Sequence, residues 1–121
     1  MGHWHAYSYT GHERPPDSEM SQVDSPCPPI EVAHWLRKPA SRIVGTHTGR
    51  DTALDWLEAQ LEDLPPVPHD LPVKTRLSYA EEFLGRGADV VWGYYTVTQR
   101  YAARAMIACP RAGENCPAPP R

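Results

Sequence analysis

The middle of the chain carries two patterns of helical periodicity. From residue 51 to 64, leucines recur every three or four positions, at Leu54, Leu57, Leu61 and Leu64. From residue 73 to 85, apolar side chains recur with the same spacing, and glycines follow. Both patterns predict amphipathic helices that pack an apolar stripe against another element. Prolines end the first helix and glycines end the second.

Segments rich in β-branched and aromatic residues predict strands. Residues 89–97 and 101–109 are two such segments, joined by three residues, and they predict a β-hairpin over 89–109. Residues 41–47 are short and β-branched and predict another strand. Residues 30–36 follow two prolines and show helical spacing, so we predict a short helix there, with a strand as the alternative.

These elements predict an α+β fold, a small domain of two layers. Strand 41–47 and hairpin 89–109 form a mainly antiparallel sheet, and helices 51–64 and 73–85 cover one of its faces. The domain spans residues 30–109.

Proline-rich segments flank this domain. Residues 1–29 combine aromatic side chains with proline and predict an extended N-terminal arm, and residues 110–121 predict a disordered tail. We expect the arm to lie across the domain or to add a strand to a neighbouring subunit.

Composition and charge narrow the class of protein. A chain of 121 residues is long enough for one domain. A net charge of -3 and a pI near 6.0 argue against binding nucleic acid by bulk electrostatics. The chain has no apolar run that predicts a membrane span or a secretory signal, so we expect a cytoplasmic protein. Abundant Arg with very little Lys is typical of a GC-rich coding sequence, such as that of a high-GC bacterium.

The segment HWHAYSYTGH, residues 3–12, holds the most distinctive pattern. In an extended strand, His3 and His5 lie on one face with backbones ~7 Å apart. Two imidazoles at that separation can converge on a divalent transition metal, and His12 becomes a third ligand if the chain folds back. An aromatic strand pairing with a sheet edge shows the same pattern. We favour that interpretation and expect no cofactor, with the metal as the alternative.

The cysteines do not form a familiar motif. There are three, Cys27, Cys109 and Cys116, and an odd number does not predict a disulfide framework. The spacing between Cys109 and Cys116 is not that of a common zinc motif. We interpret all three as thiols without a ligand.

The loop at 45–51 is a second candidate site. It joins a predicted strand to the start of a predicted helix, where unpaired N–H groups and the helix dipole favour an anion. His47, Thr48, Gly49 and Arg50 offer polar groups and close backbone approach to a phosphate or carboxylate. An ordinary turn capped by Thr48 or Asp51 is the interpretation that we favour.

Aromatic residues and Arg are enriched at protein interfaces, so their occurrence in the hairpin and the N-terminal segment predicts an interaction surface. For the hairpin, sheet core on one face with ordinary exposure of tyrosine on the other is the alternative that we favour. The candidates are Trp4, Tyr7, Tyr9, Trp92, Tyr94, Tyr95 and Arg104. We therefore expect a non-catalytic interaction or regulatory module whose partner is another protein or a second copy of itself. The alternatives are a small enzyme or binder of an anionic or aromatic metabolite at the 45–51 loop, and a metal-binding protein that uses the N-terminal histidines.

Overall fold

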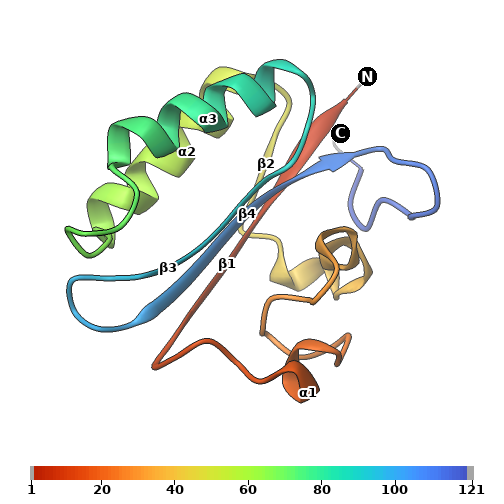
Figure 1. Ribbon diagram of the computed structural model, residues 1–121. Helices are drawn as coiled ribbons and strands as arrows, with labels where there is room; N and C mark the ends of the chain where they lie inside the picture. The colour runs from red at the N-terminus through yellow and green to blue at the C-terminus, as the bar shows by residue number, and fades with distance from the viewer. Residues whose placement is uncertain (1, 120–121) are drawn as a thin grey trace.

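The computed structural model describes residues 2–119 and shows a four-stranded antiparallel sheet with the strand order β2-β1-β4-β3 (Figure 1). The strands are β1 (His3–Gly11), β2 (Gly45–His47), β3 (Val90–Tyr95) and β4 (Tyr101–Cys109). The predicted small α+β domain with a mainly antiparallel sheet is confirmed. The hairpin prediction is confirmed as well, because β3 and β4 pair along their length.

Two helices cover one face of the sheet, as predicted (Figure 1). They are α2 (Arg50–Asp63) and α3 (Val73–Gly85). The apolar stripes of both helices are buried against the sheet, at Leu57 and Leu61 of α2 and at Ala80 and Leu84 of α3. Trp4 and Trp92 fill the sheet side of this core. The helical periodicity therefore predicted correctly both the two helices and the face that each one buries.

The N-terminal segment differs from the expected arm. Residues 3–11 form an inner strand, β1, which pairs with β2 on one side and with all of β4 on the other. The first five residues of β1 are buried on both faces of the sheet. An inner strand satisfies its N–H and C=O groups on both sides, so apolar and aromatic side chains on both faces favour this position over a free arm.

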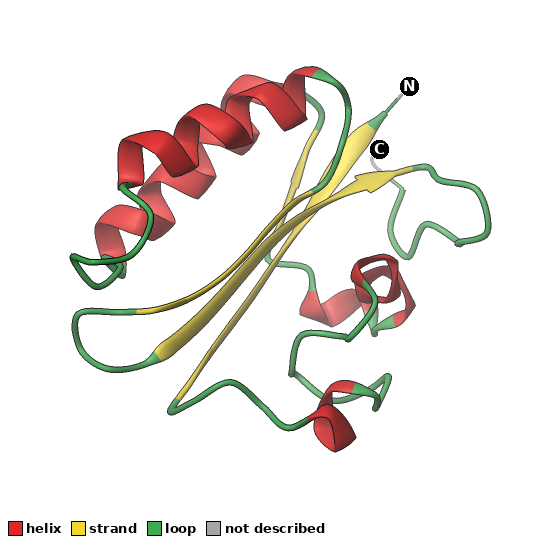
Figure 2. Cartoon of the chain, in the orientation of Figure 1, coloured by secondary structure: helices red, strands yellow, loops and turns green. Residues whose placement is uncertain are grey.

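A layer of short turns covers the second face of the sheet (Figure 2). It contains α1 (Asp17–Met20) and two 3-10 helices, η1 (Val32–Arg37) and η2 (Ala40–Arg42). Trp35 and Leu36 of η1 pack against the sheet there. The sheet thus has a layer on each face, whereas the sequence predicted a layer on one.

Two local predictions differ from the structure, one in this layer and one at the strand that follows it. The helix expected at 30–36 is a 3-10 helix shifted by a residue or two, and the strand expected at 41–47 is shortened to Gly45–His47. Pro39 lies just before η2, and the Arg42 N–H donates to its carbonyl oxygen at 2.9 Å, so the chain turns before it can pair.

The buried side chain of Lys38 ties this layer together. Its ammonium group donates to the carbonyl oxygens of Gln22, Val23 and Ser25 at 3.3, 3.2 and 2.7 Å. Burial lowers the pKa of Lys38. Three carbonyl acceptors use all three donors of the ammonium group, so the lysine acts as a structural clamp.

Among the described residues, 2–119, none of the helices combines the length and the apolar character that crossing a bilayer requires.

Candidate metal centre

β1 places both N-terminal histidines on the face of the sheet opposite α2 and α3. Alternation along the strand puts His3, His5 and Tyr7 on this face, as predicted, while Trp4 and Ala6 join the helix-side core. His3 lies directly opposite Cys109 in the pairing of β1 with β4. Directly opposed residues of an antiparallel pair have Cβ atoms ~4.5–5.5 Å apart, so register alone brings an imidazole and a thiol together.

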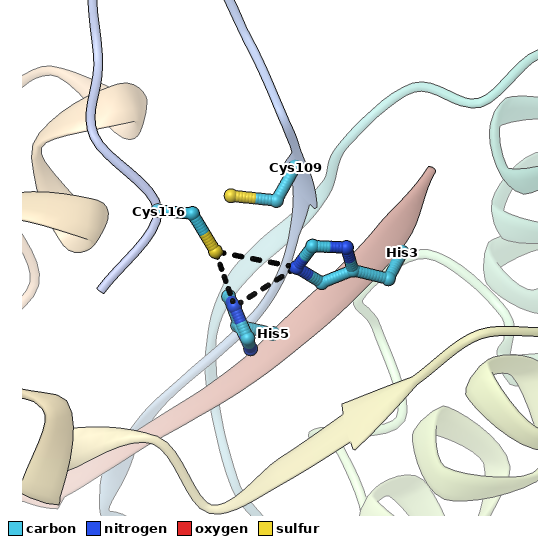
Figure 3. Close-up of side chains that lie close together, drawn as sticks. All are labelled: His3, His5, Cys109 and Cys116. Atoms are coloured by element: carbon cyan, nitrogen blue, oxygen red, sulfur yellow. Dashed lines mark hydrogen bonds between the residues drawn. The ribbon is translucent and has the colours of Figure 1, made fainter. Parts of the chain in front are cut away.

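Cys116 completes a group of four potential ligands, which we call the His–Cys cluster: His3, His5, Cys109 and Cys116. One ligand atom from each residue lies within 4.8 Å of all the others. Nε2 of His3 is 3.2 Å from Nε2 of His5, and the Cys116 sulfur is 3.4 and 3.3 Å from these two nitrogens. Figure 3 shows two rings from β1 meeting two sulfurs from the C-terminal part of the chain.

The three separations among His3, His5 and Cys116 match edges of a tetrahedral zinc site, and the Cys109 sulfur lies within 4.8 Å of these atoms. Zn–N bonds of ~2.0–2.1 Å and Zn–S bonds of ~2.3 Å hold two nitrogens ~3.3 Å apart and a nitrogen and a sulfur ~3.5 Å apart. The observed 3.2, 3.3 and 3.4 Å are close to those values. Two imidazoles and two thiolates are also a donor set typical of structural zinc.

Burial sets the protonation of the histidines. Desolvation lowers the pKa of His3 and of His5, and a positive charge on His3 would lower the pKa of His5 further. Both imidazoles are therefore neutral at pH 7, which is the form that binds a metal.

The Cys109 sulfur needs a nearby positive charge to become a thiolate. Burial, followed by the neighbouring Cys116, raises the pKa of Cys109 to about 12. A divalent cation stabilises a coordinated thiolate and removes this penalty. The cluster therefore has the protonation pattern of a site that loses thiol protons when a metal binds.

A hydrogen bond orients one of the rings. Nδ1 of His5 lies 2.9 Å from Oγ1 of Thr46, its neighbour on β2. With Nδ1 as the donor, the lone pair of Nε2 points into the cluster. Metal-binding histidines commonly have such an outer partner, which fixes the tautomer and the ring orientation.

A buried hydroxyl close to the cluster also fits a charged centre. Tyr7 is fully buried, stacks on Trp35 at 4.8 Å between ring centroids, and has no hydrogen-bond partner for its hydroxyl among the described residues. Burial raises the pKa of Tyr7, and negative charge on Cys109 and Cys116 raises it further. Metal-bound thiolates would place negative charge near the unpaired Tyr7 hydroxyl and so favour it as a hydrogen-bond donor.

Two ion pairs hold the segment that carries Cys116. Arg111 binds the carboxylate of Asp89 at 2.8 Å, and Glu114 accepts two hydrogen bonds from Arg37 of η1, each at 2.8 Å. The hydrogen bond from Arg37 lowers the pKa of Glu114. The proline-rich segment, expected to be disordered, thus has specific contacts at Arg111 and Glu114, and Cys116 packs against the core of the second face.

The metal-ligand predictions were partly wrong. His3 and His5 do converge, but His12 is exposed beyond the end of β1 and does not belong to the cluster. The two cysteines interpreted as thiols without a ligand occupy the remaining positions. The available signal was the position of Cys109 at the end of a predicted strand, since pairing that strand antiparallel with the histidine strand sets Cys109 opposite His3.

The 45–51 loop has no side-chain cap. Gly49 precedes α2 at the cap position, and neither Thr48 nor Asp51 caps the helix as expected. Nδ1 of His47 lies 3.1 Å from Oγ1 of Thr52. Thr48 and Arg50 line a cleft of about 400 Å³ at this end of the sheet, together with His3 and Cys109.

Most of the predicted interaction surface is inside the protein. Five of its residues are at least nine-tenths buried: Trp4, Tyr7, Trp92, Tyr94 and Arg104. Arg104 donates to Gln60 of α2 and to the backbone of β1, so it joins elements within the domain. Tyr9 is half-buried and Tyr95 is exposed. The aromatic pattern therefore marked sheet core more than free surface.

No protein-family model, curated protein or solved structure matches this chain.

Proposed function

We propose that this protein is a non-catalytic metalloprotein module whose His–Cys cluster binds one zinc ion. The observation that carries the proposal is the convergence of four ligand atoms, two imidazole nitrogens and two sulfurs, within 4.8 Å of one another. Four protein ligands fill a tetrahedral ion and leave no position for a substrate, which favours a structural role.

The location of the cluster supports the same role. His3 and His5 come from an inner strand, Cys109 from the end of β4 and Cys116 from the segment that follows. An ion bound by these residues would cross-link segments that are far apart in sequence and hold the C-terminal segment on the sheet. A reducing compartment, such as the expected cytoplasm, suits the proposal because it keeps the thiols reduced.

Metal analysis of untagged protein, purified without a nickel column, tests the proposal. We expect one zinc per chain, and we expect Cys116→Ser to lose most of it. Cys27→Ser is the control, since Cys27 is a free cysteine whose thiol donates a hydrogen bond to Glu19 at 3.5 Å, outside the cluster. Zinc well below one per chain in the wild type, before and after reconstitution with excess zinc, would contradict the proposal.

Substitution of zinc by cobalt gives an independent measurement. Tetrahedral Co(II) with two thiolate ligands has intense d–d and sulfur-to-metal charge-transfer bands. We expect both bands in wild type and in Cys27→Ser, and weakened charge transfer in Cys116→Ser.

A further inference from the structure

The two cysteines of the His–Cys cluster differ in their surroundings. Cys109 ends β4 and is 2% exposed, whereas Cys116 is half-buried on a segment without regular structure. Their sulfurs lie within 4.8 Å of each other. Cys116 is thus the more exposed of the two residues, and the Cys109 sulfur lies within reach of it.

We infer that the cluster is a peroxide-responsive zinc site, in which oxidation joins Cys109 to Cys116 and releases the ion. This inference rests on the proposed zinc-binding function and adds the chemical class of its signal, a hydroperoxide. Cys116 reacts first because it is the more exposed of the two cysteines, and Cys109 resolves the product because it is the neighbouring one.

The reaction balances with peroxide as the oxidant. The Cys116 sulfur attacks one peroxide oxygen, the O–O bond breaks, and the products are a sulfenic acid at Cys116 and one water. The Cys109 thiolate then attacks the Cys116 sulfur, the S–S bond forms, the S–O bond breaks and hydroxide leaves to become the second water. Two thiolates lose two electrons, one peroxide gains them with two protons, and zinc departs because only His3 and His5 still offer ligand atoms.

The arrangement of the chain favours this disulfide. Bond formation brings the sulfurs to ~2.05 Å, so one cysteine must move. Cys109 is fixed by the pairing of β4 with β1, and Cys116 lies between the Arg37–Glu114 ion pair and the end of the described segment. Cys116 lies two residues beyond Glu114 and outside any helix or strand, so its backbone can turn toward Cys109 without breaking the Arg37–Glu114 ion pair.

Cys27 offers a matched control within the same chain. It is 4% exposed, and its thiol donates a hydrogen bond to Glu19, away from the cluster. A peroxide that oxidised thiols without regard to their position would modify Cys27 as readily as Cys109.

The experiment treats the zinc-loaded full-length protein with hydrogen peroxide. A chromophoric indicator measures released zinc, and peptide mass spectrometry after thiol alkylation locates each oxidised cysteine. We expect one zinc released for each Cys109–Cys116 disulfide, the same in Cys27→Ser, and recovery of zinc binding after a thiol reductant and zinc are added. A sulfenic-acid trapping reagent, added early, should label Cys116 before Cys109.

Several results would overturn the inference. Zinc retained at a peroxide excess that fully oxidises Cys27 would do so, and so would release accompanied by sulfinic or sulfonic acid in place of the disulfide. The test is independent of Cys116→Ser, which is expected to lose zinc. The proposed function fails earlier, if the untreated protein does not load one zinc, so the two failures are distinguishable.

Discussion

The two faces of the sheet are stabilised in different ways. On the helix face, α2 and α3 bury leucine and alanine stripes against Trp4 and Trp92 in a continuous apolar core. On the other face, Trp35 and Leu36 of the turn layer pack in a smaller apolar cluster, and polar contacts lie beside it: the His–Cys cluster, the Lys38 ammonium and the Arg37–Glu114 ion pair.

The difference shows how a short chain completes a second layer. Regular helices bury an apolar stripe with every turn, whereas 3-10 turns and coil expose most of their surface and bury little. Under the proposed function, a zinc ion that joins the C-terminal segment to the sheet would supplement the apolar area that such segments lack, as metal ions do in small domains with weak cores.

Removal of the metal should have the largest effect on stability, and the effect should be confined to the face of the sheet opposite α2 and α3. Structural zinc contributes ~10–16 kcal/mol in zinc-finger peptides, and even ~3 kcal/mol here would lower the melting temperature by ~10 °C or more. A strong chelator should therefore lower the melting temperature of wild type and of Cys27→Ser alike. Hydrogen exchange should rise in η1 and around Cys116 and stay slow in α2 and α3. Uniform acceleration over both faces would show that the faces are not separable.

Truncation of the helix-face core should have the next largest effect. Leu57 is fully buried, and a Leu→Ala change in a core costs about 2–5 kcal/mol. Chemical denaturation of Leu57→Ala should show that loss of stability with zinc and, within ~0.5 kcal/mol, without it, because Leu57 shares no contact with the cluster. A loss that depends strongly on zinc would mean that the two cores are coupled.

Acidification of the metal-free protein should have a smaller effect, confined to the cluster. Burial lowers the pKa of His3 and His5 in the folded protein below the ordinary value of about 6.5, which the unfolded chain retains. Their contribution to the free energy of unfolding is therefore complete above pH 6.5. It is lost as the pH falls through the pKa values of the folded protein, because the unfolded chain binds more protons there. Melting temperatures measured from pH 8 to pH 5 should decline less in His3→Gln/His5→Gln than in wild type. An equal decline would place the titrating groups elsewhere.

The helix face could be predicted because its information is local. Leu54 to Leu64 and the apolar positions from 73 to 85 repeat with the period of the element they form, and the hairpin follows from two strand-like segments with a short connection. Each prediction needed only neighbouring residues, and the bounds of α3 agree with the predicted 73–85.

The convergence of the His–Cys cluster depends on contacts between distant parts of the chain, which no local pattern contains. The alternation of His3 and His5 predicted correctly that the rings share a face, but not which strand would lie opposite. Cys109 joins them through the register of β1 with β4, and Cys116 through ion pairs made by Arg111 and Glu114. The spacing of seven between the cysteines differs from that of common zinc motifs, in which one turn supplies both sulfurs. Here the end of a strand supplies one sulfur and the segment after it supplies the other.

The position of β1 also constrains the order of events during synthesis. An inner strand made from residues 3–11 has its longest partner at 101–109, so about a hundred residues must leave the ribosome before the sheet can close. Until then β1 exposes apolar side chains and unpaired backbone groups, as do the segments that chaperones bind. The native sheet is therefore expected to form late, only after β4 has been synthesised.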